Sequence, residues 1–241
     1  MPARALVTYA RTCPASDCVA ARRLPRRRLA EREGYASRQQ GGREGAMGDG
    51  AIKYEALTPA DVLAFDKPSG GFCCSLQANK YGISFLEFEI KDYDTKRSVF
   101  KIAKDANMPD LASLNLADIP EEAIRTVRYT MPADFLRFKT VRTELKFSVG
   151  ALEVPSFRMI ERHYFRGELI RSYDFQFGFC IPNSTNTWEA IYDMPENSEA
   201  RIGEFIASPN AHQTDSFYFV GEDMVMHNKA YFSYEEIPAT D

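Results

Sequence analysis

The sequence contains no run of about 18 apolar residues, the length that a membrane-spanning helix requires. Its start has no compact apolar stretch followed by a small-residue cleavage site, so we expect no secretory signal. A Gly-rich phosphate loop, a Walker pattern and a nucleophile elbow are also absent. We therefore expect neither stable membrane insertion nor an enzyme of the classes that those motifs mark.

Histidine and cysteine are scarce. The three histidines, His163, His212 and His227, are scattered too widely along the chain to predict a metal site. The cysteines are odd in number, two of them are adjacent, and no spacing resembles a disulfide framework or a zinc site. We expect reduced thiols in a cytosolic protein. The five cysteines are Cys13, Cys18, Cys73, Cys74 and Cys180.

The formal net charge of -4 hides an asymmetry along the chain. Residues 1–46 hold ten arginines, no lysine and four acidic residues, a balance of +6, which leaves -10 for the remainder. An acidic body without a concentrated basic patch argues against nucleic acid as the main partner. We expect a disordered Arg/Gly-rich tail over residues 1–50 and a single folded domain over residues 51–241.

From Tyr81 onward the chain contains short runs with apolar residues at every second position, which is typical of half-buried strands. Turns are predicted at Arg166–Gly167 and at Gly221–Asp223, and "PNSTNTW" indicates a polar loop. In three strands the residues predicted to share one face are Ser84, Leu86, Phe88 and Ile90; Val141, Thr143, Leu145, Phe147 and Val149; and Leu169, Tyr173, Phe175, Phe177 and Phe179.

One or two short helices accompany these strands. "LTPADVLAF" has Thr58 as a candidate N-cap and Pro59 at the first helical position. "NSEARIGEFIAS" has apolar residues at helical spacing, with Asn197 or Ser198 as its cap. Many short strands with few helices predict an all-β sandwich.

The stretch "FRMIERHYFR" presents the main puzzle. Read as a strand, it places Glu161 and His163 on the face whose ends are apolar, and arginines such as Arg162 on the opposite, wet face. Tyr129, Tyr173 and Tyr218 also fall on predicted inward faces. Unpaired buried polar groups cost about 1–3 kcal/mol each. These groups therefore satisfy one another, serve as a general acid–base pair, or contact a ligand that enters between the sheets.

Three stretches carry a resemblance to a known family. "FRMIERHYFRGELIRSYDFQFGFCIP", "DSFYFV" and "MVMHNKA" closely resemble the uncoordinated-119, or retinal protein 4, family of chaperones for N-terminally acylated proteins. The similarity runs from about Leu57 to the C-terminus. The segment "FGFCIPNSTNTW", with Trp188, is also similar to the sister family, the prenyl-binding delta subunit of the photoreceptor phosphodiesterase.

The resemblance implies an immunoglobulin-like β-sandwich with a deep apolar pocket between its sheets. It implies a carrier without enzymatic activity and without a cofactor, whose ligand is a fatty acyl chain, myristoyl or lauroyl. The implied partners are N-myristoylated cargo proteins and a GTP-loaded Arf-like small GTPase that triggers release. The expected location is the cytoplasm, with cilia or flagella and membranes as destinations of the cargo.

The resemblance also implies roles for individual residues. Tyr129 in "VRYTMP" is expected to hydrogen-bond the acyl carbonyl, and Glu161 and His163 in "MIERHYFR" to meet the first residues of the cargo peptide. The candidates for lining the lipid pocket are Tyr129, Tyr218, Phe175, Phe177 and Tyr192. The sequence departs from the family at Tyr231–Phe232 after "HNKA", where Asp-Tyr is usual. Of the properties that the resemblance implies, the choice of cargo is therefore the one that it supports least.

The residues themselves favour an acyl over a prenyl ligand. An acyl chain ends in an amide, whose carbonyl needs a donor such as the Tyr129 hydroxyl. The peptide N–H groups beyond it need an acceptor such as the Glu161 carboxylate. A prenyl cargo has no acyl carbonyl and presents a carboxymethyl group instead. A prenyl-binding solubilising factor of the phosphodiesterase delta type remains the alternative.

Overall fold

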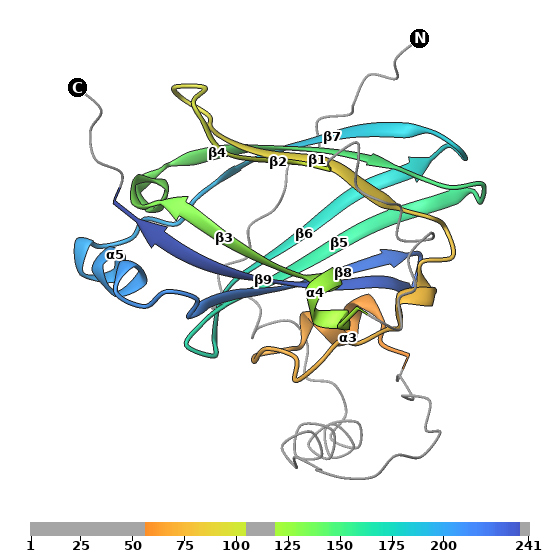
Figure 1. Ribbon diagram of the computed structural model, residues 1–241, viewed down its shortest axis with the longest axis horizontal. Coiled ribbons are helices and arrows are strands. Elements are labelled where there is room, and N and C mark those ends of the chain that lie inside the picture. The colour runs from red at the N-terminus through yellow and green to blue at the C-terminus, as the bar shows by residue number, and fades with distance from the viewer. Residues whose placement is uncertain (1–55, 105–118, 237–241) are drawn as a thin grey trace.

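The computed structural model describes residues 56–104 and 119–236, which fold into two β-sheets packed face to face (Figure 1). The expected tail over residues 1–50, with Cys13 and Cys18, lies outside the described residues. The predicted all-β sandwich is confirmed. The expected turns at Arg166–Gly167 and after Val220 join antiparallel neighbours, and both glycines there have positive φ angles.

The four-stranded sheet has the order β2 (Ser98–Ala103), β1 (Ser84–Asp92), β4 (Thr140–Ser148) and β7 (Thr185–Asp193). The five-stranded sheet has the order β3 (Thr126–Pro132), β9 (Asp223–Glu235), β8 (His212–Val220), β5 (Val154–Phe165) and β6 (Glu168–Cys180). All neighbouring strands are antiparallel except β3 and β9, which are parallel. Strand β7 begins at Thr185, inside the predicted polar loop "PNSTNTW", so the second part of that stretch is strand rather than loop.

The described ranges contain three short α-helices, one more than the sequence indicates: α3 (Pro59–Leu63), α4 (Glu121–Arg125) and α5 (Glu199–Ile206). Two 3₁₀ turns, η1 (Leu76–Ala78) and η4 (Ala133–Arg137), complete the elements. Thr58 caps α3 as predicted: its Oγ1 accepts from the Asp61 amide at 3.4 Å, while Asp61 Oδ2 accepts from the Thr58 amide at 3.0 Å. For α5 the cap is Ser198.

The predicted inward face of β4 is confirmed, because Val141, Thr143, Leu145, Phe147 and Val149 are all buried. On β1 the prediction is confirmed for Phe88 and Ile90 but wrong for Ser84 and Leu86. Leu86 is an extra residue in a β-bulge, so Phe85 lies opposite Phe147 and Phe88 lies opposite Leu145. Phe85 and Phe88 therefore face the interior together, and Ser84 and Leu86 do not share that face. A single inserted residue reverses the period-2 alternation on one side of it.

Strand β6 departs from strict alternation twice. Its register against β5 shifts at Ile170 and at Phe177, each an extra residue on β6. Ile170 therefore replaces the predicted Leu169 in the interior. Beyond Phe177 the faces are exchanged: Cys180 is buried, while Phe179, which we expected to point inward, is 55% exposed. Gly178, at φ 79°, supplies the left-handed backbone conformation beside this bulge.

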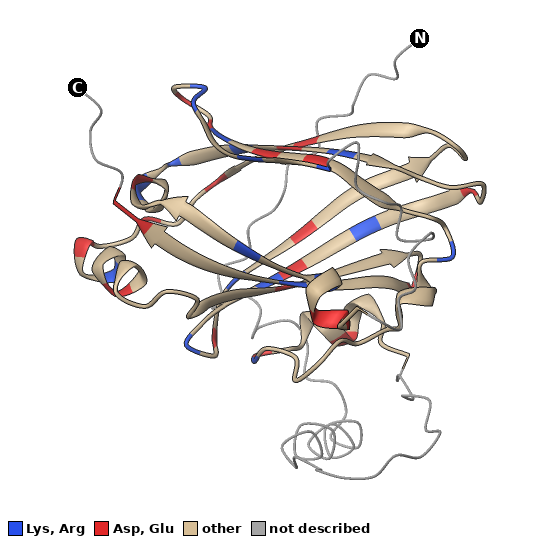
Figure 2. Ribbon diagram, in the orientation of Figure 1, with Lys and Arg blue, Asp and Glu red and all other residues tan. Residues whose placement is uncertain are grey.

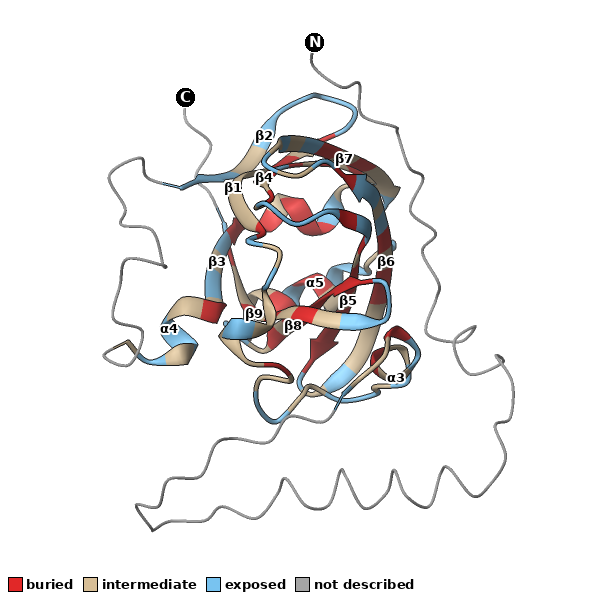
Figure 3. Cartoon of the chain, turned by 90° about the vertical axis from the view of Figure 1, so that its right-hand side faces the viewer, coloured by how far each residue is buried: buried red, intermediate tan, exposed pale blue. Residues whose placement is uncertain are grey.

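The outer face of the five-stranded sheet is covered, so the prediction of a wet, arginine-rich face on β5 is wrong. Ile160, Arg162 and Tyr164 are all buried there. The chain segment 57–79, which includes α3 and η1, forms the covering layer, and Val62 packs with Ile160, Phe217 and Phe219. Figure 3 shows α3 beside β5 on the outside of the sandwich. Arg162 donates to the carbonyl oxygen of Phe65 in this layer.

A buried charge network fastens the covering layer to β8 and β9. Asp215 is 2% exposed; its Oδ2 accepts from the Ser69 amide at 2.7 Å, and its Oδ1 lies 2.9 Å from Lys229 Nζ. His227 Nδ1 accepts from the Cys73 amide at 3.0 Å. Burial alone raises the pKa of Asp215, but His227 and Lys229 outweigh it and hold that pKa below its usual range.

The outer face of the four-stranded sheet is polar instead. Figure 2 shows acidic and basic residues interspersed along β1, β2 and β4. Lys101 pairs with Glu87 at 2.7 Å, and Arg142 pairs with Glu144 at 2.9 Å. The two sheets thus differ: the outer face of one is exposed to solvent, whereas the outer face of the other is covered over β5 and β8.

We predict that Phe217→Ala lowers the free energy of unfolding by about 3–5 kcal/mol, because Phe217 is fully buried between the sheet and its covering layer. The same change at Phe179, which is 55% exposed, is the matched control and should cost at most about 0.5 kcal/mol. Urea unfolding of the three proteins measures both values. Equal losses at the two positions would contradict the covered outer face.

Candidate functional site between the two sheets

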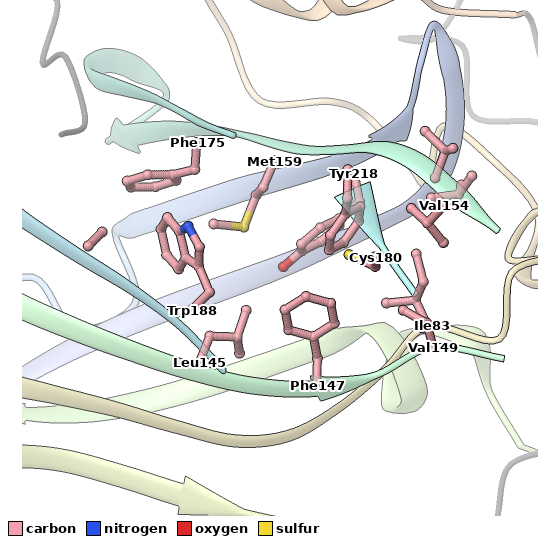
Figure 4. Packing of buried hydrophobic residues seen from close by; sticks show 14 of the residues in the cluster. Ile83, Leu145, Phe147, Val149, Val154, Met159, Phe175, Cys180, Trp188 and Tyr218 are labelled. Carbon is pink, nitrogen blue, oxygen red and sulfur yellow. The ribbon is translucent and has the colours of Figure 1, made fainter. Parts of the chain in front are cut away.

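The space between the sheets is lined by large apolar side chains from both layers. Figure 4 shows Met159, Phe175 and Tyr218 from the five-stranded sheet pointing toward Phe147 and Trp188 from the four-stranded sheet. The centroid of the Trp188 ring lies 5.1 Å from that of Phe175, and the Trp188 ring also contacts Phe177. This arrangement follows from the alternation on β4 and β7, which aims every second side chain at the opposite sheet.

A second group of rings meets nearer to β2 and β3. Tyr129 packs edge-on against Phe100 of the other sheet, with ring centroids 4.8 Å apart, and also against Phe232. At the opposite edge of the sandwich, the ring centroids of Tyr192 on β7 and Tyr173 on β6 lie 4.9 Å apart. Figure 3, an end-on view, shows β3 and β6 on opposite sides of the interior.

Several of these inward-facing rings are only half-buried, among them Phe88, Tyr129, Tyr192 and Phe232. A well-packed interior leaves few voids larger than a water molecule. A ring between two packed sheets keeps accessible surface only where a water-sized space adjoins it, inside the sandwich or at its edge. These rings therefore keep accessible surface, between the sheets or at their edges, that a ligand could cover.

Glu161 and His163 project from β5 into this interior. Glu161 Oε1 accepts from the Ser216 hydroxyl at 3.2 Å, and Glu161 Oε2 lies 3.5 Å from His163 Nε2. His163 Nδ1 lies 3.1 Å from His212 Nε2 and 3.2 Å from Thr214 Oγ1. The Glu161 side chain keeps 24% of its surface accessible, so the carboxylate is not enclosed by protein groups. One side of it remains available to a ligand.

Three tyrosine side chains lie close enough to this carboxylate for its charge to act on them. Burial raises the pKa of Tyr129 to about 12, and the nearby Glu161 charge adds to the shift. Burial likewise raises the pKa values of Tyr192 and Tyr218 well above the ordinary value, again with a contribution from Glu161. The phenols are therefore neutral donors over the physiological range, next to an acceptor.

Three polar atoms around the interior are buried without a hydrogen-bond partner among the described residues: Trp188 Nε1, His163 Nε2 and Arg171 Nε. The 3.5 Å contact of His163 with Glu161 is too long to count as a hydrogen bond. Buried donors usually have partners, and an unpartnered one costs about 1–3 kcal/mol. The interior thus offers donors as well as an acceptor to a molecule that enters it.

The structure brings all seven predicted site residues to the space between the sheets: Tyr129, Glu161, His163, Phe175, Phe177, Tyr192 and Tyr218. Their roles toward a ligand stay predictions. Arg171 also lies at this site: it is opposite His163 and donates to the Tyr173 hydroxyl at 3.1 Å. Its position between Leu169 and Tyr173 in the alternation could have revealed it.

Sequence reasoning missed two further residues at this site, His212 and Tyr234. His212 is buried, and its Nδ1 lies 2.5 Å from the Tyr234 hydroxyl. Counting back in steps of two from Tyr218 along β8 places His212 on the same inward face, so the alternation could have revealed it. Within the described ranges, no group of three or more His, Cys, Asp or Glu residues is arranged to hold a metal ion.

The described part of the chain has no helix that combines the length and the apolar character needed to cross a membrane. Its three cysteines, Cys73, Cys74 and Cys180, are free thiols. Burial raises the pKa of the Cys73 thiol to about 12, with a further rise from Asp215. A thiol in that state is a poor nucleophile. We therefore assign the two adjacent cysteines to the structure of the covering layer.

The fold and its interior define a class: a β-sandwich protein whose candidate site lies between its sheets rather than on its loops. The family model described as GMP-PDE, delta subunit, matches residues 77–234. This match spans well over half of the chain, and it covers both sheets. The chain belongs to the GMP-PDE delta subunit family.

Curated relatives cover most of the chain. It is 46% identical over 179 residues to protein unc-119 of Caenorhabditis elegans, which is 74% of this chain and 80% of that protein. It is 41% identical over 185 residues to protein unc-119 homolog B of Homo sapiens, covering 76% and 74%. The protein unc-119 homolog of Drosophila melanogaster is 41% identical over 207 residues, covering 79% and 78%. These matches confirm the resemblance read from the sequence and support a lipid-binding solubilising factor.

We predict that alkaline pH weakens the protein through Tyr129. Its folded-state pKa of about 12 lies above the ordinary value of 10.0, so the contribution of the neutral phenol is complete below pH 10.0 and is lost as the pH rises toward about 12. Urea unfolding at a series of pH values should show a shallower loss for Tyr129→Phe than for the wild type. Tyr93→Phe, at an exposed tyrosine, is the control. Identical pH slopes for all three proteins would contradict this burial of Tyr129.

Proposed function

We propose that this protein is a non-enzymatic carrier that binds the N-terminal acyl chain of myristoylated cargo proteins and keeps the cargo in solution. The observation that carries the proposal is Glu161, a partly accessible carboxylate between the sheets among aromatic side chains, several of which are only half-buried. Family membership supports the lipid-binding role. The choice of an acyl chain rests on the donors and acceptor around that carboxylate.

Transfer free energy favours such a ligand. A fourteen-carbon chain that leaves water gains roughly 10 kcal/mol, at about 0.8 kcal/mol for each CH₂ group. The rings of Phe88, Phe175, Phe177 and Trp188 supply apolar walls from both sheets. An apolar ligand that enters a space lined in this way removes its own surface and that of the walls from water.

The polar groups at the end of the chain match the polar side chains of the interior. The Tyr129 hydroxyl is a neutral donor for the acyl carbonyl, since its raised pKa prevents ionisation. The Glu161 carboxylate accepts from the first peptide N–H groups beyond the chain, a charge-assisted bond that is stronger than a neutral one. His163, 3.5 Å from Glu161, lies where it meets the same segment of the cargo.

Release and destination follow from the family resemblance. We propose that a GTP-loaded Arf-like small GTPase docks on the complex and frees the cargo, which then reaches a membrane or a cilium. A ligand buried between two sheets leaves only when the sheets or their connecting segments move. A second protein that binds the opened state better would supply the free energy for that movement.

We predict that a peptide bearing an N-myristoyl group binds far more tightly than the same peptide without it, as measured by calorimetry or fluorescence anisotropy. Tyr129→Phe should weaken binding of the acylated peptide by about 1 kcal/mol, the worth of one neutral hydrogen bond. Glu161→Ala should cost more, about 1.5–3 kcal/mol, because a charge-assisted bond is lost. Tyr93→Phe, at an exposed tyrosine, is the matched control and should bind as the wild type does.

Comparable affinity for the bare peptide would contradict the carrier role. A farnesylated C-terminal peptide that displaces the myristoylated one would favour the prenyl-binding alternative, to which the sequence similarity around Trp188 points. The unpartnered Nε1 of Trp188 inside the sandwich leaves a donor for either ligand. Competition between the two lipidated peptides on the wild-type protein decides between the two ligand classes.

A further inference from the structure

The Glu161 carboxylate is the end of a chain of four polar side chains that crosses the sheet interior. His163 Nε2 lies 3.5 Å from Glu161 Oε2, and His163 Nδ1 lies 3.1 Å from His212 Nε2. His212 Nδ1 in turn lies 2.5 Å from the Tyr234 hydroxyl. His163, His212 and Tyr234 are all buried, so water does not supply alternative partners.

The negative charge of Glu161 sets the direction of this chain. A lone pair on His163 Nε2 would face the carboxylate, so the favoured tautomer of His163 carries its proton on Nε2 and leaves Nδ1 as an acceptor. Two groups face that nitrogen, the Thr214 hydroxyl at 3.2 Å and His212 Nε2 at 3.1 Å. An unprotonated His212 Nε2 would set two lone pairs against each other, so His212 donates from Nε2 and its own Nδ1 is an acceptor. The Tyr234 hydroxyl donates to that nitrogen. Every ring nitrogen has one role, and both imidazoles are neutral.

The surroundings of the two histidines favour the neutral state. Burial lowers the pKa of His163, although the Glu161 charge opposes the shift. Burial also lowers the pKa of His212 well below its ordinary value, with further contributions from His163, Arg171 and Arg201. The charged and titratable groups that face the pair are Glu161 on β5, Arg171 and Tyr173 on β6, Tyr234 on β9 and Arg201 on α5.

We propose that His212, held by Tyr234, is a positioning residue that keeps His163 neutral by donating to its Nδ1, and thereby leaves the Glu161 carboxylate free for the cargo peptide. A proton on His163 Nδ1 would displace the hydrogen bond from His212. The imidazolium would then pair with Glu161 and compete with the peptide N–H groups. This proposal rests on the proposed function, because it gives Glu161 a cargo to bind.

The experiment uses the full-length protein and side-chain ¹H–¹⁵N correlation spectra, which distinguish the two neutral tautomers from imidazolium. The chain has only three histidines, so each signal is assigned by single substitution. We expect His163 in the Nε2–H form, neutral from neutral to mildly acidic pH. In His212→Leu, which removes the donor, His163 should protonate at a higher pH. His212→Gln supplies an amide donor in place of the imidazole N–H, so His163 should again protonate only at low pH.

His227 is an internal control in the same spectra. Its Nδ1 accepts from the Cys73 amide on the outer face of the sheet, so its tautomer and titration should not respond to changes at His212. A shift of the His227 signals would reveal a general loss of folding rather than a local effect. A wild-type His163 in the Nδ1–H form, or a His163 titration unchanged in His212→Leu, would overturn the proposal.

Binding of an N-myristoylated peptide separates the two proposals. Affinity of the wild type should be constant from neutral to mildly acidic pH, whereas affinity of His212→Leu should fall about tenfold as His163 becomes charged. The affinity of His212→Gln should stay constant over the same pH range. A pH-independent affinity in His212→Leu would overturn the positioning role. Equal binding of acylated and bare peptides by the wild type would overturn the carrier function and leave the spectroscopic result in place.

Discussion

The arrangement of the interior depends on one constraint: a carboxylate lies between two sheets whose facing sides are otherwise largely aromatic. A charge in such a place must be met by donors, and Glu161 receives one from Ser216 and faces His163 at 3.5 Å. The raised pKa values of Tyr129 and Tyr218 keep the nearby phenols neutral. The side of Glu161 that remains accessible is where a peptide behind an acyl chain would supply the missing N–H groups.

The covering layer on the five-stranded sheet complements this interior. Val62, Ile160, Phe217 and Phe219 form a compact apolar cluster on the outer face, and the buried Asp215 network ties residues 69–73 to β8 and β9. Part of the stability of the fold therefore comes from apolar packing between the five-stranded sheet and its covering layer, outside the space between the two sheets. The fold therefore does not depend on the packing of the inner faces alone.

Sequence reasoning succeeded where alternation was strict and failed where a residue was inserted. The inward face of β4 and the placement of Glu161 and His163 followed from period 2. The bulges at Leu86, Ile170 and Phe177 are invisible to that pattern, so Phe179 was placed inside although it is exposed. The outer face of β5 was judged wet because arginines mark it, and only tertiary structure shows that the chain around α3 covers them. The hydrogen-bond partners of His163, which are His212 and Thr214, both come from β8, more than 40 positions away.

The most direct test of the central claim, that an acyl chain lies between the sheets, uses the single tryptophan of the chain. Trp188 is buried between Phe175 and Phe177, so its fluorescence reports on the interior alone. A peptide whose N-terminal acyl chain carries bromine should quench this fluorescence on binding, while the same peptide without bromine should bind equally and quench far less. Binding of the brominated peptide with no change in Trp188 fluorescence would contradict a ligand between the sheets.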